Sequence, residues 1–247
     1  MPKIALLSDI HSNLEALEAC LAHAARQGAD TFAFLGDLVG YGPDPAATLD
    51  RIMAIASAGA PVVLGNHDQA VWDDAIRLNP VARQAILWTR PRLTAAHLAF
   101  LQSLPLTHHL EHLLLVHASA EQPEAWTYLT RETEAAASLA ATDATWTFAG
   151  HVHHQLLFYQ ASDLRTHAFS PTPGVAIPLS ERRRWVATVG SVGQPRDRNT
   201  AAAYALFDAA ARAVTFHRVP YDWGRTIYKI YSQGLPPALA HRLSEGR

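Results

Sequence analysis

The chain has 247 residues, of which 49% are hydrophobic and 17% are charged. This apolar content excludes a disordered chain, and 13 Gly and 15 Pro are too few for a collagen-like or low-complexity sequence. The formal net charge of −2 provides no basic surface for general nucleic-acid binding. We expect a single domain over residues 1–247, with one sizeable core.

The cysteine content and the N-terminal segment bear on the cellular compartment. Cys20 is the only cysteine, so no internal disulfide forms. The apolar start of the chain, from Ile4 to Leu7, reaches Ser8 and Asp9 too soon for a signal peptide. No stretch approaches the ~18 apolar residues that a membrane span needs. We therefore expect a cytoplasmic protein without a membrane partner.

Short apolar runs alternate with helical patterns from the start of the chain. Strands are predicted at 3–7, 31–35 and 61–64, and helices at 13–27 and 46–58. This order favours a parallel sheet with crossover helices, and hence an α/β fold. Further strands are predicted at 112–116, 145–149, 156–160, 185–189, 203–207 and 213–218, and a helix at 132–141.

Residues 70–104 differ from this alternation. Their pattern is helical throughout, with breaks at Pro80 and Pro91, and nothing in it alternates as a strand would. We interpret the stretch as a helical excursion that covers part of a functional site. The tail, residues 221–247, carries only weak signals of either kind.

Each buried strand in the first two-thirds of the chain is followed by side chains that can bind metals. In an open parallel sheet the carboxyl ends of the strands lie along one edge, where such folds place their sites. We therefore expect five strand ends to converge on one crevice. The residues there are Asp9 and His11, Asp37, Asn66 with His67 and Asp68, His117, and His151 with His153.

This ligand set supplies oxygen and imidazole nitrogen but no thiolate. Such ligands suit Mn²⁺, Fe, Zn²⁺, Co²⁺ or Ni²⁺. They are too many for one ion, so we expect two divalent ions that share a carboxylate. Gly36, Gly65 and Gly150 each precede a ligand, where the absence of a side chain lets the backbone turn sharply.

Two neighbouring cations on mixed nitrogen and oxygen ligands suit the hydrolysis of a phosphate ester. They lower the pKa of a bridging water, which provides hydroxide for in-line attack, and they draw charge from the phosphoryl oxygens. His67, beside Asn66, is the natural group to assist the leaving oxygen. Asp68 could hold the His67 ring and keep it protonated.

The segments together form the pattern Asp9-x-His11, Gly36-Asp37, Gly65-Asn66-His67-Asp68, His117 and Gly150-His151-x-His153. In order and residue type this pattern resembles the calcineurin-type metallophosphoesterases. The resemblance covers about residues 1–155 by motif. It implies the metallo-dependent phosphatase fold, a four-layer α/β/β/α sandwich of two facing mixed sheets.

The resemblance also implies a role for each residue of the pattern. The ligands of the first metal would be Asp9, His11 and His153. The ligands of the second would be Asn66, His117 and His151. Asp37 would bridge both ions, and His67 would face the phosphate as the acid, with Asp68 behind it.

Two further segments resemble compact prokaryotic members of the family, described as predicted phosphodiesterases or protein-phosphatase-like. They are residues 36–43, GDLVGYGP, and residues 190–197, GSVGQPRD. The second is expected to border the crevice, where Arg196 or Arg198 would contact a substrate phosphate or else lie in solvent. Tyr41 is expected near the crevice mouth, where its ring would stack on a nucleoside or phenolic leaving group.

The residues outside this pattern have simpler interpretations. His154 should point away from its neighbour His153 and is not counted as a ligand. His23 and His97 lie on predicted helices and are expected to face solvent. Core packing is the default for Trp126, in the loop after His117.

The leading interpretation is a dinuclear-metal phosphoesterase that prefers phosphodiesters, because a compact core with one excursion leaves the metals open. The alternative enzyme is a protein-phosphatase-like or dinucleoside-polyphosphate hydrolase. A non-catalytic metal-binding scaffold would be marked by lost ligands, but every position is filled here. The expected partners are a small phosphate-ester substrate, nucleotides included, and further copies of the chain in a homo-oligomer.

Overall fold

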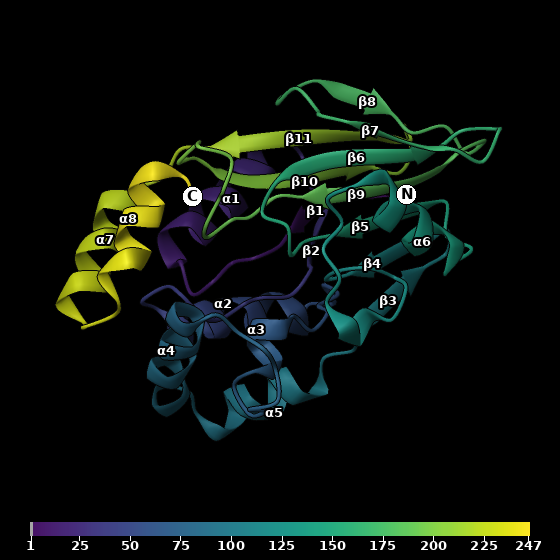
Figure 1. Ribbon diagram of the computed structural model, residues 1–247. Coiled ribbons are helices and arrows are strands. Elements are labelled where there is room, and N and C mark those ends of the chain that lie inside the picture. The colour runs from purple at the N-terminus through teal and green to yellow at the C-terminus, as the bar shows by residue number, and fades with distance from the viewer. Residues whose placement is uncertain (1) are drawn as a thin grey trace.

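Two mixed β-sheets face each other in the computed structural model, which describes residues 2–247, and helices lie outside them (Figure 1). The first sheet has the order β2-β1-β10-β11-β8 and the second the order β3-β4-β5-β9-β6-β7. The strands of the first sheet are β1 (Lys3–Leu7), β2 (Thr31–Phe34), β8 (Ala176–Pro178), β10 (Ala202–Asp208) and β11 (Ala213–Val219). Those of the second are β3 (Thr107–Leu110), β4 (Leu113–Val116), β5 (Trp146–Ala149), β6 (Gln155–Gln160), β7 (Thr166–Phe169) and β9 (Arg184–Val189).

The helices cover the outer faces of the sheets and one end of the sandwich. They are α1 (Leu14–Arg26), α2 (Pro45–Ser57), α3 (Asn66–Gln69), α4 (Pro80–Thr89), α5 (Ala95–Ser103), α6 (Glu132–Ala140), α7 (Trp223–Ser232) and α8 (Pro237–Glu245). Two short 3₁₀ turns are η1 (Arg90–Arg92) and η2 (Pro123–Ala125). Helix α1 packs against β10 and β11, and α6 packs against β6, β7 and β9. None of the described helices is both long and apolar enough to cross a membrane.

Alternation along β1 explains how the sandwich forms. Leu6 packs between the two sheets with Phe148 and Phe207, whereas Leu7 packs outward with Leu17 of α1. All five residues are buried, because each face of the strand meets an apolar layer. The expected fold class, an α/β sandwich of two facing mixed sheets, is confirmed.

Parallel pairing determines where the site lies. Strands β1 and β2 run parallel in the first sheet, as do β4, β5 and β9 in the second. The loops after these strands then meet and bond to one another: the Gly193 amide donates to Asp9 O at 2.9 Å, and the Gly150 amide donates to His117 O at 2.9 Å. The convergence of strand ends that the sequence predicts is therefore built from backbone hydrogen bonds between the loops.

Several predicted elements differ from the observed ones. Residues 61–64 do not form a full strand, since only Val62 bridges Phe34, and the Leu64 amide donates instead to Pro105 O. Residues 70–79 form turns rather than a helix, so the excursion is helical only from Pro80 onward. Pro80 starts α4, because proline lacks the N–H that a first helical turn leaves unpaired.

The strands that the sequence did not predict are short strands at the edges of the sheets. Strands β3, β7 and β8 have three or four residues each and are largely half-exposed or exposed. They carry too little apolar alternation to be recognised in the sequence. The weakly patterned tail forms α7 and α8, which pack on each other as a helical hairpin at one end of the molecule (Figure 1).

Candidate metal centre

The loops after β1, β2, β4 and β5, together with Asn66 at the start of α3, bring two overlapping groups of ligand atoms together. In the first group, Asp9 Oδ1 lies 3.1 Å from His153 Nε2, and His11 Nε2 lies 3.2 Å from the same nitrogen. In the second, His117 Nε2 lies 3.2 Å from both Asn66 Oδ1 and His151 Nδ1. The two groups come from distant segments of sequence, as the strand-end argument requires.

Asp37 connects the two groups through one oxygen. Its Oδ2 lies 3.7 Å from His11 Nε2 and 3.5 Å from His117 Nε2, one histidine from each group. Its other oxygen, Oδ1, accepts the His67 backbone N–H at 2.8 Å. This hydrogen bond from the His67 backbone fixes the Asp37 carboxylate, so that Oδ2 alone faces both ligand groups.

The histidine tautomers are set by carbonyl groups behind the rings. His11 Nδ1 lies 3.2 Å from Val39 O, His117 Nδ1 lies 2.7 Å from Leu35 O, and His153 Nδ1 lies 2.6 Å from Gln194 O. Each Nδ1–H donates to its carbonyl, which turns the Nε2 edge of the ring inward, where a metal could bind it.

The arrangement fits two cations. Ions held at about 2.1 Å by nitrogen and oxygen have neighbouring ligand atoms about 3.0–3.4 Å apart, close to the separations within each group. Asp9 Oδ1 is buried and accepts no hydrogen bond, and His151 Nδ1 meets only another histidine nitrogen. Buried acceptors gathered without donors are costly unless a cation satisfies them. The residues present can therefore hold two divalent ions.

Backbone strain is concentrated at these ligands. Asp9, His11, Asp37, His151 and His153 all have positive φ, at 52°, 49°, 52°, 66° and 63°. Non-glycine residues avoid this left-handed region, and where they occupy it the surrounding structure forces them to. The two groups of ligands are thus positioned at an energetic cost by the loops that carry them.

The glycine before His151 shows why these loops need small residues. A Cβ on Gly150 would overlap Ser8 Oγ and lie 2.7 Å from Asp9 Oδ2. The close approach lets the His151 backbone N–H donate to Asp9 Oδ2 at 2.9 Å, which holds the carboxylate with Oδ1 inward. The sharp turn expected at this glycine is present.

Electrostatics within the site follow from burial and from pairing. Burial lowers the pKa of His67 to about 4 and that of His151 to about 3. Burial also acts on His117, but the facing Asp37 carboxylate outweighs it and raises the pKa of His117 to about 9. Asp37 has its pKa held well below the usual range, since the facing histidine charges, His117 foremost, outweigh its burial. These effects favour a proton on His117 in the metal-free centre.

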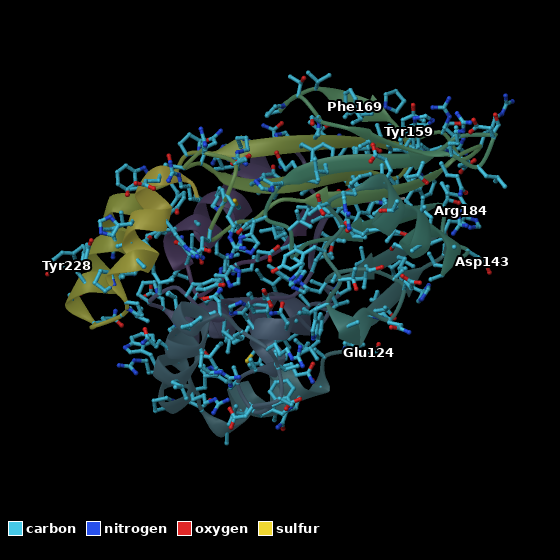
Figure 2. The ribbon with its side chains drawn as sticks, in the orientation of Figure 1. Glu124, Asp143, Tyr159, Phe169, Arg184 and Tyr228 are labelled. Carbon is cyan, nitrogen blue, oxygen red and sulfur yellow. The ribbon has the colours of Figure 1, made fainter. Side chains whose placement is uncertain are left out.

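A cavity of about 430 Å³ opens over the ligands. Its floor includes Asp37, Asn66, His67, His151 and His153. Residues 75–79 of the excursion form one wall, and Glu124, Trp126 and Tyr128 form another. Figure 2 shows Glu124 in the lower part of the view, close to the helices labelled α3 and α5 in Figure 1.

Comparisons with known proteins agree with this geometry. Residues 2–212 match the sequence model described as the calcineurin-like phosphoesterase superfamily domain. The chain belongs to this superfamily. An uncharacterized protein of Methanocaldococcus jannaschii is 34% identical to it over 250 residues, covering 99% of this chain and 98% of its own.

Solved structures support the same assignment. A metallophosphoesterase from Sphaerobacter thermophilus is similar at 38% identity with a TM-score of 0.87, covering 100% of this chain and 99% of its own. A hypothetical protein from Pyrococcus horikoshii OT3 shares the fold at 20% identity with a TM-score of 0.80, covering 100% and 99%. The resemblance read from the sequence motifs is thereby confirmed.

Within this calcineurin-like phosphoesterase, Asp68 differs from its expected position. Its carboxylate accepts the N–H groups of Leu38 at 2.8 Å, Val39 at 3.1 Å and Gly65 at 3.1 Å. It does not hold the His67 ring, whose buried Nδ1 has no hydrogen-bond partner. The expectation that Asp68 keeps His67 protonated is therefore wrong: a helical turn directs adjacent side chains in different directions, and Asp68 braces the backbone of two site loops.

The structure places two of the three residues expected at the crevice in the lining of the cavity. Tyr41 and Arg196 both line the cavity, but Arg198 is exposed and lies outside the lining. Tyr41 is only 4% exposed, because its ring packs 4.5 Å from His67 and 4.6 Å from His11. Its ring therefore has no free face on which a leaving group could stack. Arg196 is held by Gln194 Oε1 at 2.9 Å.

Two aromatic residues of the cavity were not predicted from the sequence. Trp126 lines the cavity rather than the core, and Tyr128, which the motifs do not include, stacks on His151. Both residues lie in a loop without periodicity, which offered no signal for them.

Two histidines outside the motif pattern have different outcomes. His97 does not face solvent as expected: it is 4% exposed, bonds Thr94 in a capping box and lies 2.9 Å from Asp50. His154 contacts Arg196 O, away from the two groups of ligands, as expected of a residue that is not a ligand.

Proposed function

We propose that this protein is a dinuclear-metal phosphoesterase that hydrolyses phosphate esters, phosphodiesters in preference to monoesters. The observation that carries the proposal is Asp37 Oδ2, which faces a histidine of each ligand group at the floor of a cavity. One shared carboxylate oxygen between two nitrogen and oxygen ligand sets is the arrangement a two-metal hydrolytic site needs.

Each ion would have three ligands of its own and share Asp37 with the other. The first would be held by Asp9, His11, Asp37 and His153, and the second by Asp37, Asn66, His117 and His151. When bound, the ions supply Lewis-acid stabilisation of the phosphoryl oxygens and lower the pKa of water at the site. Mn²⁺, Fe, Zn²⁺, Co²⁺ and Ni²⁺ all suit these donors.

His67 is the group that would assist the leaving oxygen. Its Nδ1 lies against Gly40, so the opposite nitrogen, Nε2, is the one available to the cavity. Burial and the nearby Arg196 favour the neutral ring. A bound phosphate anion reverses this balance, because its negative charge raises the pKa of an adjacent imidazole. His67 would therefore take up a proton with the substrate and donate it to the departing oxygen.

The size of the cavity favours a diester, whereas the charges on its walls do not distinguish a diester from a monoester. Arg77 and Arg196 line the cavity together with the carboxylate of Glu124, so either anion would meet both attraction and repulsion. The volume of about 430 Å³ leaves room for two ester substituents.

Turnover of four substrates in Mn²⁺ tests the proposal. We expect bis(p-nitrophenyl) phosphate to give a higher kcat/KM than p-nitrophenyl phosphate, a diadenosine polyphosphate or a phosphopeptide. Asp37→Asn should abolish the activity, with circular dichroism confirming that the variant folds. No turnover of any ester by metal-loaded protein, or full activity of Asp37→Asn, would overturn it. A preference for the polyphosphate or the phosphopeptide would favour the alternative hydrolases.

A further inference from the structure

One wall of the cavity is a strained segment, residues 122–128, between β4 and α6. Gln122 and Trp126 have left-handed backbone conformations, with φ of 54° and 55°, on either side of η2. Such conformations cost energy in non-glycine residues and persist where the surroundings require them. Their effect here is to place Trp126 and Tyr128 in the lining of the same cavity.

Tyr128 presents one face of its ring to the protein and keeps the other free. Its ring stacks on His151 with centroids 4.0 Å apart and planes 25° apart. The residue is nevertheless 50% exposed, although it lines the cavity. Trp126 lies edge-on to His117 at 5.7 Å, and its buried Nε1–H has no acceptor. The two rings thus cover two ligands of the second group and offer the cavity a flat aromatic surface.

This surface lies on the side of the centre away from the leaving-group acid. His67 packs against Tyr41 and His11, which belongs to the first ligand group. Tyr128 and Trp126 pack against His151 and His117, which belong to the second. A substituent resting on Tyr128 is therefore the ester group that stays on phosphorus, since the departing oxygen must lie at His67.

We propose that Tyr128 and Trp126 bind a flat aromatic group, a nucleobase or an aryl ring, on the non-leaving ester substituent of the substrate. The inference rests on the phosphodiesterase function proposed above and names its substrate class. An aromatic ring with one free face stacks on any flat π system. Arg77 and Asn79, which line the same cavity, offer hydrogen-bonding groups to the edge of a nucleobase.

Three diesters with the same leaving group test, by their kcat/KM values, whether an aromatic retained substituent favours turnover. Thymidine 5′-(p-nitrophenyl) phosphate, phenyl p-nitrophenyl phosphate and methyl p-nitrophenyl phosphate differ only in the substituent that stays. We expect the first two to exceed the methyl ester in kcat/KM by about 5- to 100-fold, the usual effect of one stacked ring. Tyr128→Leu should remove this preference and Tyr128→Phe should keep it. Tyr231→Leu, at a tyrosine that is 51% exposed on α7, is the matched control and should change nothing.

Calorimetric binding to the Mn²⁺-loaded protein separates the inference from the proposed activity. We expect thymidine 5′-phosphate and phenyl phosphate to bind more tightly than methyl phosphate, and Tyr128→Leu to remove the difference. Equal binding of all three phosphates overturns the inference, even if every ester is hydrolysed. Selective binding without turnover would support the aromatic site and refute the hydrolase. Tighter binding of thymidine 5′-phosphate than of phenyl phosphate would show that the site prefers a nucleobase. Equal affinities would show that it accepts any aryl group.

Discussion

The Asp68 carboxylate accepts the Leu38 backbone N–H at 2.8 Å, across 30 residues of sequence. The same carboxylate accepts the N–H groups of Val39 and Gly65, so it joins the loop that carries Asp37 to the loop that carries Asn66. Burial and the neighbouring Asp37 raise the pKa of Asp68 to about 8. Its contribution is to hold the ligand loops together, since it makes no hydrogen bond to the adjacent His67 ring.

Asp68→Ala should therefore reduce stability before it alters the chemistry. Three buried N–H groups would lose their acceptor, and each costs about 1–3 kcal/mol when unsatisfied, although relaxation and water entry recover part of this. We expect the free energy of unfolding of the metal-free protein to fall by several kcal/mol in a urea titration. An unchanged midpoint together with a large loss of kcat would instead support the sequence-based role, in which Asp68 orients His67.

His67→Ala should separate metal binding from turnover. His67 Nε2 serves the leaving group in the proposed mechanism, and each ion retains its other ligands. We expect the variant to keep both ions, measured by elemental analysis, while kcat falls by about 10²–10⁴-fold, the usual contribution of a positioned acid. An equal loss of one ion and of activity would identify His67 as a ligand, since it lies within the ligand group that includes His11 and Asp37.

The paired His117 and Asp37 predict that metal binding depends on pH. With its pKa raised to about 9, His117 is protonated at pH 7 in the metal-free protein and must lose that proton to bind an ion. His151, with a pKa of about 3, is already neutral. We expect Mn²⁺ affinity to rise about tenfold per pH unit between pH 7 and pH 8.5, and to level off near pH 9.

Proton release gives an independent measure of the same effect. Calorimetric titration of Mn²⁺ at pH 7 in buffers of different ionisation enthalpy should show about one proton released per protein. Asn66→Ala is the control, because it removes a second-ion ligand that does not titrate. Affinity that does not change between pH 7 and pH 8.5 would contradict a protonated His117.

The metal ligands were predictable because their signal is local. A buried strand followed by an ionisable residue needs no tertiary information, and parallel pairing then places Asp9 and Asp37 together at the end of one sheet. His117 follows a strand of the other sheet, so the single open sheet that the sequence suggested is in fact two sheets whose strand ends meet. The role of Asp68 was not predictable in this way, since the direction of its side chain depends on a short helical turn at residues 66–69. Sequence adjacency to His67 suggested a contact that the turn geometry does not allow.

The positions of the aromatic residues around the cavity could not be predicted from the sequence, for a different reason. Tyr41 was expected to be free at the crevice mouth, but its burial depends on Leu239 and Leu243 of α8, about two hundred residues later. Tyr128 lies in a loop with neither periodicity nor motif, and only the tertiary packing places it on His151. Contacts between distant segments determine which face of each aromatic ring is open, and a local sequence pattern does not predict such contacts.

The helical hairpin α7–α8 should be required for the stability of the site. It follows residue 212, where the match to the superfamily domain ends, yet Leu239 is 1% exposed and packs in one cluster with Tyr41, Ala82 and Ile230. Leu239→Ala removes buried apolar surface behind Tyr41 and should lower the free energy of unfolding by about 2–5 kcal/mol. Leu87→Ala, at a leucine that is 53% exposed on α4, is the matched control and should stay within about 0.5 kcal/mol of the parent. Equal unfolding free energies for the two variants, measured by urea titration, would show that the hairpin is dispensable.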